Sequence, residues 1–185
     1  MPEAPLRSRQ SVTIDAPPEV VWEYNADLAR IAEFHPRVDR VELIDGQSRR
    51  AAGVGYKCHL RGGRHTCVER DVEVVPMERI VTTLAEDSFG VARLLPDYRV
   101  VSTLERVGAG RTRVEFRHYY SIRGWKAWLF HWIAGRRIAR ESQATLNAMK
   151  QAIENRVSEL VAQRSDSAEP GAAADGGGMW RCWTS

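Results

Sequence analysis

The chain has 185 residues, of which 43% are hydrophobic and 28% charged, enough for one hydrophobic core and too few for two separate domains. Its net charge is only +3, and its 24 Arg and 3 Lys are spread along the sequence, which argues against the clustered basic face of a nucleic-acid-binding protein. The cysteines have no metal-ligand spacing, no stretch is long and apolar enough to cross a membrane, and we expect a cytoplasmic protein without a secretory signal.

The first two thirds of the chain predict a strand, two short helices and a set of further strands. Residues 7–14 alternate polar and apolar side chains, which predicts a strand. Two helices are expected next, over 18–27 and 28–34, the second ended by Pro36. Between residues 37 and 122 the apolar period is two and Gly or Pro interrupts it repeatedly, which predicts six strands in meander order.

The last part of the domain predicts one long helix. From Trp125 to about Gln163 apolar residues recur at steps of three and four, so a single stripe is expected to face the sheet. Small residues form the middle of this stripe: Gly135, Ala139 and Ser142. Either the helix lies unusually close to the sheet there, or space remains between them. Residues 164–185 are rich in Gly, Ala and Ser and predict a disordered tail, which leaves residues 1–163 as one α+β domain.

The register of the first predicted hairpin follows from the rule that a one-residue slip moves every side chain to the other face. A two-residue loop at residues 62–63 would place Cys58 opposite Cys67, but would also put several acidic side chains on the apolar face. A three-residue loop avoids this and sets Lys57 opposite Glu69 on the outer face. We therefore predict the three-residue loop.

The same reasoning at residues 108–110 also predicts a three-residue loop. Its register brings apolar and aromatic residues together on the inner face and sets Glu105 opposite Arg113 outside. The expected inner neighbours are Leu104 with Val114, Ser102 with Phe116, Val100 with His118, and Tyr98 with Tyr120.

These registers place several polar side chains among aliphatic neighbours on the inner face, with Arg70 near enough to Glu86 for the two to meet. An unpaired buried charge costs several kcal/mol, so such groups must pair, contact water or face a ligand. We therefore predict an internal ligand-binding cavity. Its predicted lining residues are Tyr56, Arg70, Glu86, Tyr98, Ser102, His118 and Tyr120.

Several segments in this order resemble the SRPBCC superfamily of START-like helix-grip proteins, in particular its polyketide cyclase/dehydrase and lipid-transport branch. The similarity extends over residues 7–163, and the segments that carry it are Val12–Trp22, Gly53–Gly55, Val74–Ile80 and Ala144–Lys150. The resemblance implies a curved antiparallel sheet of about seven strands (β-α-α-β6-α) wrapped around a long C-terminal helix. It also implies a hydrophobic cavity of the kind used for lipids, hormones and polyketides, but it transfers no catalytic residue.

The leading functional hypothesis is binding or carriage of a small hydrophobic molecule, such as a lipid, polyketide or aromatic compound. One alternative is a polyketide cyclase or aromatase that uses the same cavity, with His118 or Arg70 assisting enolisation. A second alternative is a module that binds a protein or a ribosomal partner through its outer sheet face. Whether the protein is an enzyme stays open.

Four residues near the first hairpin are of types that bind zinc: Cys58, His59, His65 and Cys67. In the predicted register only Cys58 points inward, so the four do not converge tetrahedrally. We expect no metal and no cofactor.

Three tryptophans begin the stripe of the last helix: Trp125, Trp128 and Trp132. As stripe residues they would cover the mouth of the barrel. The alternative is a transient contact with a membrane surface during lipid loading. Three nearby arginines would assist such a contact: Arg136, Arg137 and Arg140.

Overall fold

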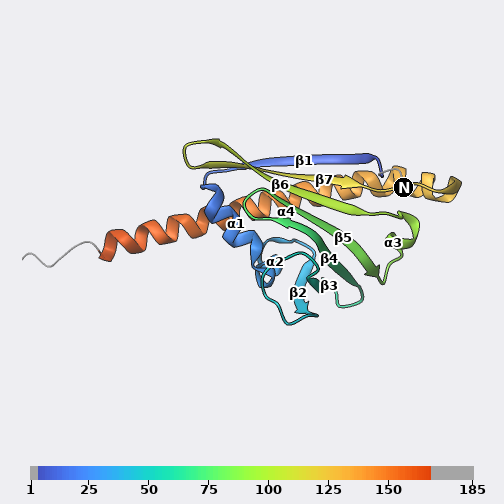
Figure 1. Cartoon of the computed structure of the whole chain (residues 1–185), viewed down its shortest axis with the longest axis horizontal. Helices are drawn as coiled ribbons and strands as arrows, with labels where there is room; N and C mark the ends of the chain where they lie inside the picture. The colour runs from blue at the N-terminus through green and yellow to red at the C-terminus, as the bar shows by residue number, and fades with distance from the viewer. Residues whose placement is uncertain (1–3, 168–185) are drawn as a thin grey trace, which may run out of the picture.

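The structure, a computed structural model, describes residues 4–167, except for the side chains of residues 126, 127, 130 and 164–167. Seven antiparallel strands form one sheet in the order β1-β7-β6-β5-β4-β3-β2, and a long helix, α4, crosses one face of it (Figure 1). The elements are β1 (Leu6–Ile14), α1 (Pro18–Ala26), the 3-10 helix η1 (Leu28–Arg30), α2 (Ile31–Phe34), β2 (Val38–Leu43), β3 (Gly55–Leu60), β4 (Thr66–Val75), β5 (Arg79–Asp87), α3 (Val91–Leu94), β6 (Arg99–Gly108), β7 (Arg111–Tyr119) and α4 (Gly124–Ser167). The predicted α+β architecture is confirmed, with the short helix α3 as an addition.

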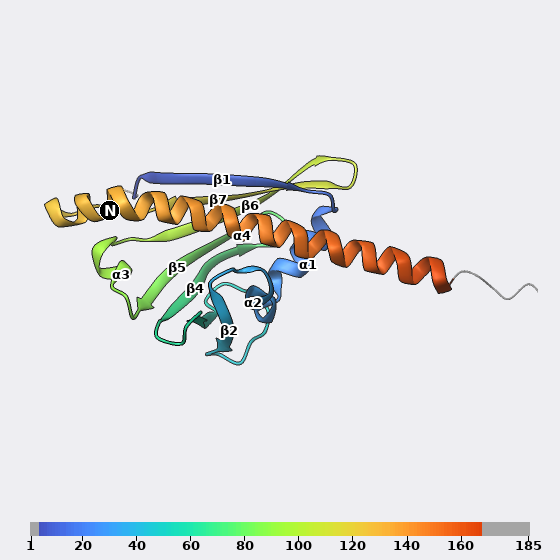
Figure 2. The ribbon, with the colours of Figure 1, turned by 180° about the vertical axis from the view of Figure 1, so that it is seen from behind.

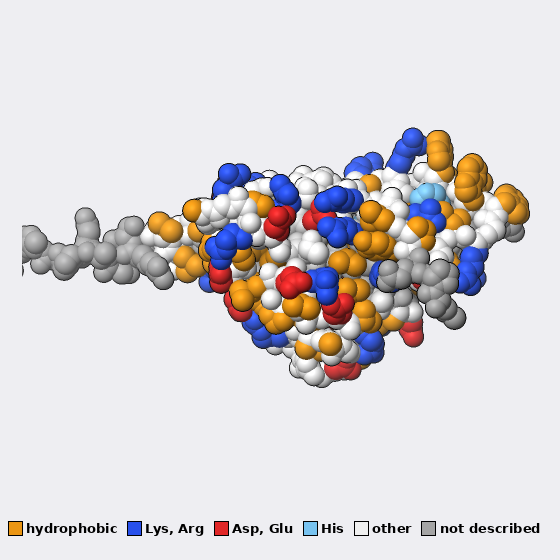
Figure 3. Space-filling view, turned by 45° about the horizontal axis from the view of Figure 1, so that its top comes forward, with side chains coloured by type: hydrophobic (Ala, Val, Ile, Leu, Met, Phe, Trp, Pro, Cys, Tyr) orange, Lys and Arg blue, Asp and Glu red, His pale blue; other side chains and the backbone are white. Residues whose placement is uncertain are grey.

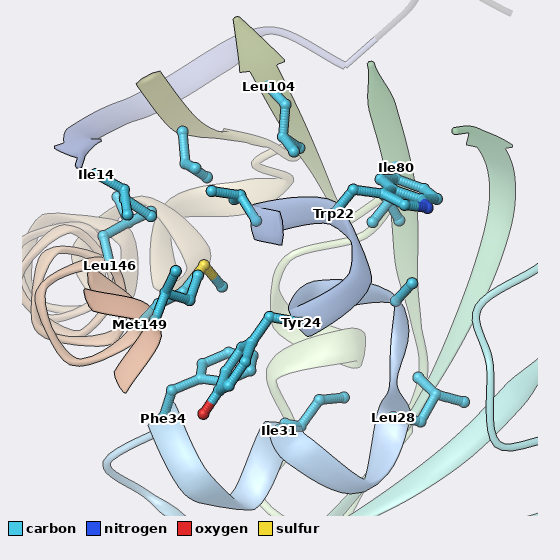
Figure 4. Close-up of a cluster of buried hydrophobic side chains, with 14 of the residues drawn as sticks. Ile14, Trp22, Tyr24, Leu28, Ile31, Phe34, Ile80, Leu104, Leu146 and Met149 are labelled. Atoms are coloured by element: carbon cyan, nitrogen blue, oxygen red, sulfur yellow. The ribbon is translucent and has the colours of Figure 1, made fainter. Parts of the chain in front are cut away.

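Helices α1 and α2 close one end of the space between the sheet and α4. Proline occupies the first turn of α1, where its missing N–H leaves no helical hydrogen bond unmade. Their side chains Trp22, Tyr24 and Phe34 belong to the same buried cluster as Leu146 and Met149 of α4 (Figure 4). This cluster is the solid core of the molecule.

Helix α4 is longer than the strands of the sheet. Its 44 residues correspond to about 66 Å at the rise of an α-helix, whereas a ten-residue strand such as β6 spans about 33 Å. The helix therefore extends past the sheet at both ends (Figure 1, Figure 2). It continues to Ser167, beyond the predicted end at residue 163, and the rest of the predicted tail lies outside the described residues.

The stripe predicted for α4 is buried only in the middle of the helix. Leu146 and Ile153 are fully buried, and Ser142 nearly so. The barrel-mouth interpretation of the three tryptophans is wrong, because the exposed fractions of Trp125, Trp128 and Trp132 are 72%, 62% and 59%. Apolar side chains stand out from that end of the molecule (Figure 3).

The register predicted for the hairpin of β6 and β7 is confirmed, but the predicted three-residue loop is wrong. A bulge between Arg106 and Gly108 pairs Gly108 with Arg111 and leaves a two-residue turn. Leu104 lies opposite Val114, and Glu105 lies opposite Arg113 on the outer face. Next to the strand ends, the rings of Tyr98 and Tyr120 stack with their centroids 5.8 Å apart. The alternation of apolar residues on both strands was sufficient to predict this pairing.

The hairpin of β3 and β4 has the register that was rejected. Cys58 lies directly opposite Cys67, so the three-residue loop and the pairing of Lys57 with Glu69 are wrong. The turn glycines at residues 62 and 63 have φ angles of 91° and 67°, a left-handed backbone that glycine adopts without steric cost. As a result Glu69, which was expected outside, turns toward the interior.

This register also changes the places of Arg70 and Glu86, which were predicted to meet on the inner face. Arg70 faces outward, with 45% of its side chain exposed, and its guanidinium donates a hydrogen bond to the carbonyl oxygen of Gly53. A bulge between β4 and β5 pairs Glu86 with Val68, and the Glu86 side chain is exposed. The predicted inward placement of both residues is wrong because of the register shift and this bulge.

Candidate functional site

A cavity of about 200 Å³ lies between the sheet and α4. For comparison, an apolar cavity of about 150 Å³ holds benzene, so this space suits a molecule of about one or two rings. Its apolar walls are Ile31, Phe34, Ile80, Val100, Phe116, Ile138 and Met149. Its polar lining residues are Asn25, His35, Arg50, Tyr56, Glu69, Thr82, Tyr98, Ser102, His118, Glu141, Ser142 and Thr145. The interior therefore combines apolar walls with hydrogen-bonding groups, as ligand sites do.

His118 on β7 is held between hydroxyl groups from two other elements. The Tyr98 hydroxyl lies 2.9 Å from Nδ1, and the Ser142 hydroxyl of α4 lies 2.7 Å from Nε2. Burial lowers the pKa of His118 to about 4, so the ring is neutral at pH 7, with one nitrogen donating and the other accepting. The three side chains form a short hydrogen-bonded chain along the cavity wall.

Ser102 on β6 provides a buried hydroxyl group beside this chain. Only 8% of the residue is exposed, it lines the cavity, and its Oγ has no hydrogen-bond partner among the described residues. Buried polar groups without partners are rare because each costs about 1–3 kcal/mol. The Ser102 hydroxyl is thus available to a molecule in the cavity.

A second polar cluster surrounds Arg50, which belongs to the connection between β2 and β3. Its Nη1 donates to both Asp71 carboxylate oxygens, at 2.8 and 3.0 Å, and to the Tyr56 hydroxyl at 2.9 Å. The Thr82 hydroxyl donates to Asp71 at 2.7 Å. Asp71 is fully buried, and these partners compensate its charge as a buried carboxylate requires.

Glu69 extends this cluster toward the cavity. It accepts a 2.8 Å hydrogen bond from the Tyr56 hydroxyl and lines the cavity. Burial raises the pKa of Glu69, against the lowering effects of Tyr56 and Arg50. The cavity therefore has a charged, hydrogen-bonded group at Arg50 and a neutral one at His118.

The structure brings together four of the predicted site residues on the cavity wall: Tyr56, Tyr98, Ser102 and His118. Tyr120 is buried behind Tyr98 and binds His131 Nδ1 through its hydroxyl at 2.8 Å, so it supports the wall without lining it. Arg70 and Glu86 lie elsewhere, as described above.

Sequence reasoning missed Arg50, Glu69 and Asp71. The rejected two-residue loop of the β3–β4 hairpin could have revealed the two acidic residues, because its register places Glu69 and Asp71 on the inner face. No periodic pattern marks Arg50. Of the four zinc-type residues of this hairpin, Cys67 is buried in the core together with Cys58 and does not point outward as predicted. The four do not converge, since His59 contacts Glu42 and His65 contacts Ser88.

The sheet wrapped on a long C-terminal helix defines the protein as a START-like helix-grip domain. A family model described as polyketide cyclase/dehydrase and lipid transport matches residues 5–154, so the chain belongs to that family, as its sequence predicted. No curated protein matches the sequence significantly. Among the residues that the structure describes, no helix is long and apolar enough to span a bilayer.

Three solved structures illustrate the shared fold. The Zhui aromatase/cyclase from Streptomyces sp. R1128 is 22% identical over 80% of this chain and 93% of its own, with a TM-score of 0.65. A protein from Thermus thermophilus is 17% identical over 80% and 97%, with a TM-score of 0.63. A START superfamily protein from Mycobacterium smegmatis is 12% identical over 84% and 99%, with a TM-score of 0.58.

Proposed function

We propose that the protein binds and carries a small, largely apolar molecule that has at least one polar oxygen, in the cavity beneath α4. The observation that carries this proposal is the buried, partnerless hydroxyl of Ser102 on the wall of the cavity. A ligand oxygen would restore its missing hydrogen bond, while the surrounding apolar side chains bury the rest of the ligand. The family to which the chain belongs, polyketide cyclase/dehydrase and lipid transport, supports ligands of polyketide or lipid type.

Native mass spectrometry of the purified protein tests the carrier function. We expect an apolar molecule to co-purify and to be released on denaturation. A protein that is empty after expression, and whose melting temperature does not rise with any member of a panel of aromatic, polyketide and fatty-acid compounds, would contradict the proposal.

Substitution of Ser102 locates the site. Ser102→Leu fills part of the cavity, and we expect ligand affinity to fall at least roughly tenfold, the effect of losing about 1.4 kcal/mol. Ser102→Ala removes only the partnerless hydroxyl, so the ligand-free protein should gain about 1 kcal/mol of stability while ligand binding weakens. Thr103→Leu, on the next position of β6, is the matched control and should leave affinity unchanged.

Cyclase or aromatase activity is the second candidate, and the chain Tyr98–His118–Ser142 favours it. These groups would polarise a ligand carbonyl and move a proton during enolisation. With a pKa of about 4, His118 is a weak base at pH 7, and for this reason we rank binding first. Turnover of a poly-ketone substrate that is lost in His118→Ala, while the ligand still binds, would reverse this order.

We also propose that the protein works in a reducing cytoplasm, where the thiols of Cys58 and Cys67, which lie directly opposite each other on β3 and β4, would stay reduced.

A further inference from the structure

The start of α4 carries a group of exposed apolar side chains that the cavity does not use. We call it the helix foot, and its residues are Trp125, Trp128, Leu129, Trp132 and Ile133. Their exposed fractions lie between 50% and 72%. In a space-filling view, apolar and basic side chains gather at this end of the molecule (Figure 3). Soluble proteins rarely expose so many large apolar side chains in one place without a partner for them.

The helix foot occupies one face of α4, the face turned away from the sheet. Its members follow each other at steps of three and four residues, so they form one continuous stripe. Arg136 and Arg140 continue this stripe at the same spacing and are exposed. The Arg136 guanidinium lies over the Trp132 ring, 4.6 Å from its centroid. The opposite face, at Ala134 and Ser142, is buried.

The charges around the helix foot are positive. The first turn of α4 contains no acidic residue. The nearby carboxylates already have basic partners: Asp97 lies 3.8 Å from Arg123, and Glu141 lies 2.7 Å from Arg37. Among the side chains that the structure describes, Arg136 and Arg140 form no ion pair with a carboxylate. Two guanidinium groups therefore remain available to an anionic surface.

We propose that the helix foot docks the protein on the surface of a membrane that contains anionic lipids. Tryptophan and aliphatic side chains on one face of a helix enter the boundary between headgroups and acyl chains, while adjacent arginines contact lipid phosphates. Tryptophan and arginine are also common in protein interfaces, so the charge around the stripe decides between the two partners. The first turn of α4 has no acidic residue, and Arg136 and Arg140 have no carboxylate partner among the described side chains, which fits an anionic lipid surface.

The helix foot lies close to one end of the cavity. Ile138 lines the cavity and follows Trp132 by about 9 Å along the helix axis. Docking would therefore hold one end of the cavity close to the lipid surface. The proposal does not depend on the identity of the cavity ligand, since it rests on the exposed side chains alone.

Cosedimentation with vesicles tests this proposal. The full chain should bind vesicles of phosphatidylcholine mixed with phosphatidylglycerol, and bind pure phosphatidylcholine vesicles much more weakly. Trp128→Ala with Trp132→Ala should weaken partitioning at least roughly tenfold. Arg136→Ala with Arg140→Ala should weaken binding to the anionic vesicles roughly tenfold. The substituted side chains are exposed, so the melting temperatures should stay close to that of the parent protein.

The other end of α4 supplies a matched control. Leu160 and Val161 are also exposed apolar residues that extend past the sheet, with 43% and 59% of their surface accessible. Their replacement by alanine should leave vesicle binding unchanged. Equal binding by the tryptophan variant and this control would overturn the proposal. So would a parent protein that is dimeric in lipid-free buffer and that becomes monomeric in the tryptophan variant, because a second copy would then cover the foot.

Discussion

Replacing Arg50 with methionine is expected to lower the free energy of unfolding by about 3–5 kcal/mol. The substitution keeps most of the apolar side-chain volume but removes the guanidinium that contacts both carboxylate oxygens of Asp71. Asp71 is fully buried and would retain only the Thr82 hydroxyl as a side-chain partner. Urea unfolding followed by circular dichroism measures the loss.

A second substitution tests whether the buried charge is the cause. Asp71→Asn in the Arg50→Met background removes the uncompensated charge and should recover more than half of the lost stability. Arg106→Met is the control, because Arg106 pairs with Glu19 at 2.7 Å but both side chains are more than half exposed, and such pairs contribute about 1 kcal/mol or less. A loss in Arg50→Met no larger than in Arg106→Met would contradict the argument.

The Arg50 cluster also explains which part of the sheet the sequence could not predict. The prediction assumed that the acidic residues on β4 face solvent. It therefore placed Val74, and every second residue before it on this strand, on the inner face of the sheet. Val74 does pack against the core. A bulge between Asp71 and Glu73 interrupts the alternation of inner and outer residues, so Asp71 also lies on the inner face. Alternation cannot reveal such a bulge, nor a buried arginine partner that comes from a distant loop.

Other parts of the fold were predictable because one short-range signal determined them. The hairpin of β6 and β7 has an unbroken inner row on both strands, and its register placed Ser102 and His118 correctly. In α4 the period was correct, but a period alone does not say which of the apolar positions meet the sheet. For that reason Trp128 and Trp132 were assigned to the interior although both side chains are exposed.

The stability of the protein is expected to fall between pH 7 and pH 5 because His118 is buried in its neutral form. Its pKa is lowered by burial from 6.5 to about 4, so as the pH falls the unfolded chain takes up a proton before the folded one. The stabilisation from this residue is complete above pH 6.5 and is lost as the pH falls from 6.5 toward 4, by about 1.4 kcal/mol per pH unit. His35, whose pKa burial also lowers to about 4, acts in the same direction.

Urea unfolding at pH 7 and pH 5, compared between the parent protein and His118→Gln, isolates the contribution of His118, which should be about 2 kcal/mol. Carboxylates with lowered pKa values, such as Glu115 and Glu154, lose their contributions mainly below their ordinary value of 4.5, outside this interval. His118→Gln cannot titrate, so its difference in stability between the two pH values should be smaller than that of the parent protein by that amount, whatever its stability at pH 7. An equal pH dependence in His118→Gln and the parent protein would mean that His118 takes up its proton at the same pH in the folded and unfolded chain, which would contradict the lowering of its pKa by burial.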